Sequence, residues 1–270
     1  MLVGLSSLVF ADPGNIRYTK HNLSSTLPTA PGFNVSRGYN SSNVTQICIF
    51  CHTPHNAQPS QPLWNKVLPA DRLAFRLYTS SGTLSPTAKG AELLADSPSL
   101  LCLSCHDGKT AVNIIHNVGY APHGTTSTGK PVLDIFGMYN NPAGGGAPTE
   151  GISMGFFGGY GSYGANLGST AANQYDGTNL TNDHPIGFSY SNAAAENTNL
   201  NRLYDVPNVI QNSSGKIRFF SPNNRIECSS CHDPHVSYED GAPSPSNTAL
   251  RPFLVMSNAG SAMCLSCHKK

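Results

Sequence analysis

The chain has 270 residues, and only 11% of them are Asp, Glu, Lys or Arg, whereas soluble proteins average about 25%. It contains 26 Gly and 20 Pro, which favours loops and short elements over long surface helices. The 16 Lys and Arg nearly balance the 15 Asp and Glu, and no basic run is interleaved with aromatic residues. We therefore do not expect nucleic acid as a partner.

The N-terminal residues predict export. Residues 1–10 are apolar, and Ala11 precedes Asp12-Pro13-Gly14, as in a signal segment with a small-residue cleavage site. Ten apolar residues are far fewer than the ~20 that span a bilayer. We expect residues 1–11 to be a signal-peptide remnant and the mature chain to have no membrane span.

All eight cysteines lie in four Cys-x-x-Cys-His motifs. This spacing is typical of c-type haem attachment, in which two thiols bond to the haem vinyl groups and the histidine ligates the iron. Zinc sites and disulfides also use paired cysteines, but neither requires a histidine after every second cysteine. We expect four covalently bound haem c groups. Their thioether cysteines are Cys48, Cys51, Cys102, Cys105, Cys228, Cys231, Cys264 and Cys267, and their proximal ligands are His52, His106, His232 and His268.

The residues around these motifs repeat in the order A-B-A-B. The first and third motifs continue to a second histidine, as in His52-Thr53-Pro54-His55, whereas the second and fourth share Cys-Leu-Ser-Cys-His. Each A motif also follows an isolated upstream histidine. The repeat predicts a first dihaem half over residues 12–139 and a second over 171–270, joined by a Gly- and aromatic-rich loop at 140–170 in one continuous haem-cored domain.

The expected fold class is a multihaem cytochrome c that is mostly irregular, with short α-helices and little β-structure, organised around stacked haems. Short helices are expected at residues 70–78 and 87–94, the second opened by Pro86. A helical turn is expected at each haem motif, and residues 218–220 are expected to belong to a short strand.

Six other histidines are available as distal iron ligands: His21, His55, His116, His123, His184 and His235. The repeat selects His21, His55, His184 and His235, which would make every iron bis-His. His116 and His123 have no counterpart in the second half, and either remains an alternative. His55 and His235 each lie three residues after a proximal histidine, so each must serve a different haem, most simply those of Cys105 and Cys267.

Several segments together resemble the OmcE-like tetrahaem outer-surface cytochromes, a family related to the doubled CxxCH multihaem group. They are TKHNLS, CIFCHTPHNA, PLWN, CLSCHDG, NDHPIGF, ECSSCHDPH and the final CLSCH, running from about residue 17 to the C-terminus. The resemblance implies closely spaced haems and assembly into extracellular filaments. It also implies that one iron takes its distal histidine from a neighbouring subunit, and His21 matches that role.

The expected function is electron conduction through a head-to-tail homo-polymer at the cell surface, towards redox partner proteins or an extracellular acceptor. A soluble periplasmic tetrahaem shuttle is the alternative. A haem reductase is disfavoured because no Cys-x-x-Cys-Lys motif is present and the spare histidines suffice to close every iron. We therefore do not expect an enzyme.

Overall fold

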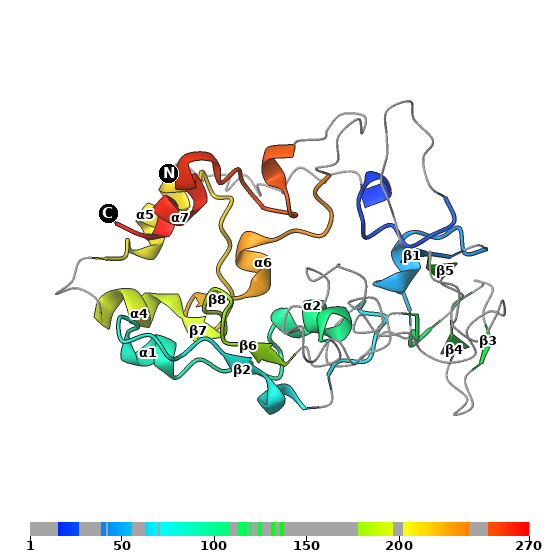
Figure 1. The fold of residues 1–270 in the computed structure, drawn as a ribbon, viewed down its shortest axis with the longest axis horizontal. Coiled ribbons are helices and arrows are strands. Elements are labelled where there is room, and N and C mark those ends of the chain that lie inside the picture. The colour runs from blue at the N-terminus through cyan, green and yellow to red at the C-terminus, as the bar shows by residue number, and fades with distance from the viewer. Residues whose placement is uncertain are drawn as a thin grey trace, which may run out of the picture.

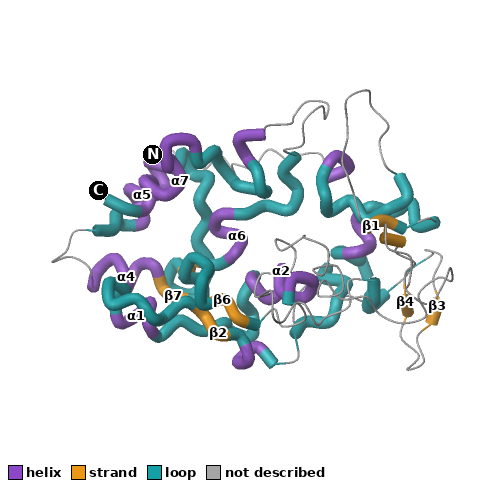
Figure 2. Tube along the Cα trace, in the orientation of Figure 1, coloured by secondary structure: helices purple, strands orange, loops and turns teal. Residues whose placement is uncertain are grey.

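The computed structural model describes residues 16–26, 39–41, 43–55, 63–69, 71–107, 113–117, 119, 124–125, 131–132, 136–137, 178–196, 202–237 and 248–269. The expected signal segment 1–11, the loop at 140–170 and His123 lie outside the described residues. Short elements separated by loops dominate the described part (Figures 1 and 2). This agrees with the mostly irregular fold expected from the sequence.

The helices are all short. The α-helices are α1 Pro86–Lys89, α2 Ser99–His106, α4 Tyr190–Glu196, α5 Val206–Asn212, α6 Cys228–Cys231 and α7 Ala262–Cys267. The 3₁₀ turns are η1 Ile16–Tyr18, η2 Cys48–Phe50, η3 Arg72–Ala74, η4 Thr248–Leu250 and η5 Ala259–Ser261. Within the described residues, no helix combines the length and apolar character needed to cross a bilayer.

The strands form four two-residue pairs. The antiparallel pairs are β1 Tyr39–Asn40 with β5 Phe136–Gly137, β3 Gly124–Thr125 with β4 Pro131–Val132, and β7 Phe188–Ser189 with β8 Arg225–Ile226. The parallel pair is β2 Arg76–Leu77 with β6 Asn179–Leu180. This parallel pair joins the two sequence halves.

The helix expected at residues 70–78 is wrong. Asp71 caps only one 3₁₀ turn by accepting a hydrogen bond from the Leu73 amide (3.0 Å). Phe75 then turns to extended backbone, and β2 follows. Pairing with β6 thus overrides the local helical pattern, as tertiary context commonly does.

The helix expected at residues 87–94 is present but shorter. Ser85 caps α1 by accepting from the Ala88 amide (3.2 Å), Pro86 occupies the first turn, and the helix ends at Gly90. The strand expected at residues 218–220 is reduced to an isolated antiparallel bridge between Phe220 and Arg225.

Two apolar clusters form the core of the described residues. The first joins α1, α4, α5 and the β7–β8 pair, near the end of the molecule where α5 lies beside α7 (Figure 1). The second joins the β2–β6 pair to α2. Both contain residues of the two sequence halves, so the halves share one core. The buried members are Ala88, Phe188, Tyr190, Ala193, Val209, Ile217 and Ile226 in the first cluster, and Phe75, Leu77, Leu93, Leu100, Leu103 and Leu180 in the second.

Candidate haem sites

Each Cys-x-x-Cys-His motif lies on a helical turn, as the sequence predicts. The first motif begins at η2, the second lies in α2, the third forms α6 and the fourth ends α7. Residues three apart share one face of such a turn, so both sulfurs of a motif can meet one porphyrin edge. In the last two motifs the backbone becomes extended at the histidine. All eight cysteines have free thiols.

Sulfur atoms of successive motifs lie near one another. Burial raises the pKa of the Cys51 thiol to about 12, and the Cys105 thiol adds to this shift. The Cys102 and Cys228 thiols act on each other, which raises the pKa of Cys102 and lowers that of Cys228. The second motif is therefore adjacent to both the first and the third.

The third motif is in turn adjacent to the fourth. Burial raises the pKa of Cys231 to about 11, with smaller contributions from Cys228 and Cys264. Burial likewise raises the pKa of Cys267 to about 12, and Cys231 adds to it. The four attachment points thus follow one another through the protein in sequence order.

Three pairs of histidine rings lie at the spacing of axial haem ligands. Two imidazoles on one metal have ring centres about 6 Å apart, because each metal–nitrogen bond is about 2 Å. The ring centroids lie 6.1 Å apart for His21 and His106, 6.3 Å for His52 and His235, and 6.3 Å for His184 and His268. Each pair joins one proximal histidine to one histidine expected as distal, and all six belong to the same chain.

Hydrogen bonds orient several of these imidazoles. His184 Nδ1 lies 2.9 Å from the Pro185 carbonyl oxygen, and His232 Nδ1 lies 3.0 Å from that of Pro252. A carbonyl oxygen can only accept, so Nδ1 donates and Nε2 is left to bind a metal. His235 Nδ1 lies 2.9 Å from Asp233 Oδ1, where an ionised carboxylate accepts in the same way.

Burial lowers the pKa of several of these imidazoles, which favours the neutral form that an iron ligand requires. The pKa of His21 falls to about 3, mainly because the ring is buried and secondly because His106 lies beside it. Burial is also the main reason for the lowered pKa of His52, with His235 next, and for that of His268, with His184 next. The free thiols and paired rings fit haem c, which would supply one-electron iron chemistry at each site.

The pairing differs from the sequence expectation for His21. Its ring faces His106 of the same chain, whereas the family resemblance gave it a role between subunits. The reason is that the N-terminal segment folds back: the Ser25 amide donates to the Val44 carbonyl (2.8 Å), and the Phe253 ring packs 4.4 Å from the His21 ring. The role of His21 between subunits stays a prediction.

The pairing also differs for the histidines of the A motifs. His235 was expected to serve the haem of Cys267 in its own half, but it faces His52 of the other half. His55 was expected to serve the haem of Cys105, where His21 lies instead. In the described part of the chain, no aromatic or imidazole ring faces His55 or His232, and both are exposed.

His116, the alternative ligand, and Trp64 of the PLWN segment both lie near the first site. The His116 amide donates to the Asn65 carbonyl (2.8 Å), so the backbone of His116 supports the first motif. The Trp64 ring meets His52 edge-on at 5.5 Å between centroids. Trp64 therefore packs beside an axial ligand.

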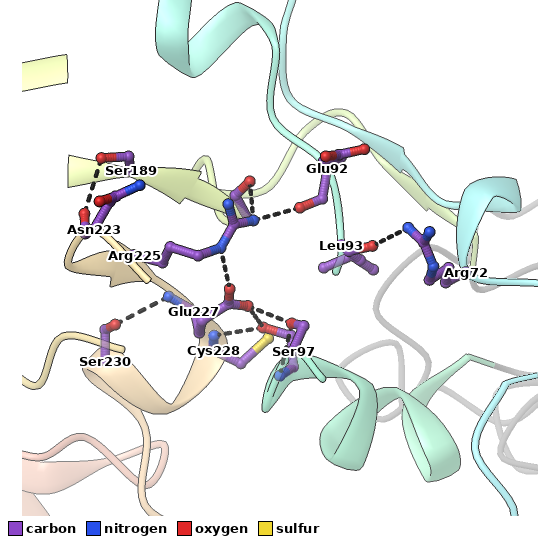
Figure 3. A network of polar contacts seen from close by, with 12 residues as sticks. Arg72, Glu92, Leu93, Ser97, Ser189, Asn223, Arg225, Glu227, Cys228 and Ser230 are labelled. Atoms are coloured by element: carbon purple, nitrogen blue, oxygen red, sulfur yellow. Dashed lines mark hydrogen bonds and ion pairs between the residues drawn. The ribbon is translucent and has the colours of Figure 1, made fainter. Parts of the chain in front are cut away.

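A buried polar network, which the sequence analysis missed, joins the second motif to the third (Figure 3). Arg225 Nε donates to Glu227 Oε1 (3.1 Å), and Glu227 Oε2 accepts from the hydroxyls of Ser97 and Ser99 (2.6 Å each). The Ser99 hydroxyl also accepts from the Cys228 amide (3.0 Å). The loop before α2 is thus fixed to the first residue of α6.

The Arg225 guanidinium extends this network to two backbone segments. Its Nη2 donates to the carbonyl oxygens of Glu92 and Gly187. Gly187 has φ +75°, and a Cβ there would lie 2.7 Å from the Glu92 oxygen, so only glycine fits this close approach. The sequence around Arg225 and Glu227 has no local pattern that predicts their burial. The buried ion pair forms only when distant segments of the folded chain surround it.

A family model described as the doubled CXXCH motif matches residues 221–270, which contain the third and fourth motifs. This match, together with the four attachment motifs and the paired histidines, supports a multihaem c-type cytochrome that takes part in electron transfer. No curated protein matches the chain.

Proposed function

We propose that the chain is the subunit of an extracellular filament that conducts electrons through four bis-His haems. The main support is the succession of attachment points, with the second motif adjacent to the first and third, and the third adjacent to the fourth. Such an order gives electrons a continuous path from one end of a subunit to the other. The sequence resemblance to outer-surface filament cytochromes supports assembly.

The junction between subunits is proposed to complete the third haem. Three of the four proximal histidines face a histidine of their own chain, and among the described residues no ring faces His232. His55 of a neighbouring copy is the proposed distal ligand, because it is exposed and matches His235 in the repeat. This contact is head-to-tail, and such a contact propagates into an open filament unless its rotation closes a ring.

Bis-His ligation supports electron transfer over catalysis. Two strong ligands on each iron leave no position for a substrate, whereas an enzyme needs an open or exchangeable site. The export signal expected at residues 1–11 supports a location outside the cytoplasm, and the filament is proposed to lie at the cell surface.

A soluble periplasmic shuttle is the second candidate function. The observation that favours it is the cis placement of His21, His184 and His235, which already supplies three distal ligands within one chain. In that protein, His55 of the same chain would be the distal ligand of the iron bound by His232.

Electron microscopy of the exported holoprotein separates the two functions. The filament proposal expects polymers from the wild type and from His116→Ala, the matched control. It expects none from His55→Ala, whose monomers should carry four haems, one of which lacks a distal ligand. A wild-type protein that stays monomeric with all four haems low-spin would contradict the filament and support the shuttle.

A further inference from the structure

The turn that carries His55 is tied to a distant segment of the chain. Thr53 lies between the proximal ligand His52 and His55, is 5% exposed, and donates from its hydroxyl to the His55 carbonyl oxygen (2.7 Å). Asn117 Nδ2 donates both to the Thr53 hydroxyl (3.1 Å) and to the same His55 carbonyl oxygen (2.9 Å). One side-chain amide therefore fixes the backbone of His55 from a position 62 residues further along the sequence.

Asn117 is itself held on both sides. Its backbone amide donates to Asn65 Oδ1 (2.7 Å), and its carbonyl oxygen accepts from Asn65 Nδ2 (2.8 Å). Asn65 is fully buried, and its own amide donates to the Cys51 carbonyl oxygen (2.9 Å) in the first haem motif. Asn117 Oδ1 accepts from the Gly119 amide (3.0 Å), which directs Nδ2 to the two oxygens of the turn. The first haem motif and the turn at His55 are thus joined through one pair of asparagines.

The second half of the repeat supports its equivalent histidine in a related way. Asp233 takes the place of Thr53, and its Oδ1 accepts from the His235 amide (3.0 Å) and lies 2.9 Å from His235 Nδ1. Arg218 Nη2 in turn donates to Asp233 Oδ2 (2.9 Å). In the first half the hydroxyl bonds to the backbone of His55, and that residue remains exposed. Each half therefore supports the residue between its two histidines with a side chain from outside the motif.

We infer that Asn117 is a positioning residue for His55, which it holds ready to ligate the haem iron bound by His232. A ligand whose backbone is already fixed loses less conformational freedom when it binds, so its bond to the iron is favoured. The inference rests on the proposed function for the role of His55 as a distal ligand. It holds whether His55 reaches a neighbouring copy or the haem of its own chain.

Binding of CO to the reduced holoprotein tests this inference, because CO binds where the distal histidine has left the iron. Asn117→Asp has nearly the same shape and keeps the acceptor for Gly119, but it removes both bonds to the turn. We expect one haem per chain to bind CO at least about tenfold faster than in the wild type, because two hydrogen bonds no longer hold His55. Thr53→Val, which removes the hydroxyl at nearly constant shape, should act in the same direction, and Thr53→Ser should bind CO like the wild type.

The double variant Asn117→Asp with His55→Ala shows whether Asn117 acts through His55. It should bind CO like His55→Ala alone, whereas a general loosening of the turn would open the iron of His52 as well. Asn224→Asp is the matched control, because it removes a side-chain donor that bonds to the Ser191 hydroxyl (2.8 Å) at an exposed position. This control should bind CO like the wild type.

Two results would overturn the inference: wild-type CO binding by Asn117→Asp, or binding by the double variant that exceeds that of His55→Ala. A wild type that stays monomeric, while Asn117→Asp and His55→Ala both gain CO binding at one haem, would contradict the filament and support the positioning role. Wild-type CO binding by His55→Ala would contradict both, because His55 would then not be a ligand. A haemochrome assay checks that each variant carries four haems. If Asn117→Asp does not, the comparison of Thr53→Val with Thr53→Ser decides, and equal CO binding by those two variants would overturn the inference.

Discussion

Replacing Glu227 by Gln should destabilise the protein strongly, because it breaks the buried network between the second and third motifs. The Glu227 side chain is 1% exposed and accepts hydrogen bonds from Arg225, Ser97 and Ser99. Glutamine has nearly the same shape, but its amide nitrogen would meet donors where a carboxylate oxygen now accepts. The Arg225 guanidinium would also lose its anionic partner.

The size of the effect follows from these contacts. A hydrogen bond to a charged group contributes about 1.5–3 kcal/mol, but the three bonds share one carboxylate and their contributions do not add. Removing one partner of a buried ion pair costs about 3–5 kcal/mol, which we take as the expected loss in the free energy of unfolding. For a chain of this size that loss lowers the melting temperature by roughly 10 °C.

Thermal unfolding of the holoprotein, followed by circular dichroism, measures this loss. Glu196→Gln is the matched control: it makes the same change at an exposed carboxylate, which accepts from the Thr87 amide (2.9 Å) on the surface. We expect the control to unfold close to the wild type, since isolated surface contacts contribute little. If Glu227→Gln melts at the same temperature as Glu196→Gln, the reasoning about the buried pair is refuted.

Three further changes have defined outcomes. Gly187→Ala should lower the free energy of unfolding by at least ~2 kcal/mol in a denaturant titration. Gly215 has a similar φ of +74°, but nothing lies within 4 Å of the Cβ that a substitution would add, so Gly215→Ala should lower the free energy of unfolding less. Equal losses in the two variants would exclude the predicted clash between a Cβ at residue 187 and Glu92. His21→Ala should leave one more ferrous haem per chain able to bind CO than the wild type has, and a variant that binds no more CO than the wild type would show that His21 is not a ligand in cis. The haem-free chain should lack native circular dichroism, because ligand binding and folding are coupled in such proteins; a native spectrum would argue for a self-sufficient apolar core.

The sequence predicted the chemistry of the attachment sites better than the connections between them. The Cys-x-x-Cys-His spacing is local, so it predicted a helical turn at each motif, which the structure confirms. The repeat also selected His21, His184 and His235, all of which face a proximal histidine. Local and repeated signals were sufficient to select these residues as candidates, and their ligation of iron stays a prediction.

The partners of those histidines could not be predicted, because they depend on how distant segments pack. His235 is 183 positions after His52 in the sequence, yet the two ring centroids lie 6.3 Å apart with ring planes inclined by only 17°. The helix expected at residues 70–78 failed for the same reason, since β2 pairs with β6 about 100 positions away. Burial of Lys66 and Glu227 likewise arises only in the folded chain.

Intact-mass spectrometry of the exported, denatured protein tests the central claim most directly. Thioether bonds survive denaturation, whereas haem held only through its iron is lost. The account predicts one dominant species whose mass equals that of the mature chain plus four haems. A dominant species with fewer haems, or with none after denaturation, would contradict it.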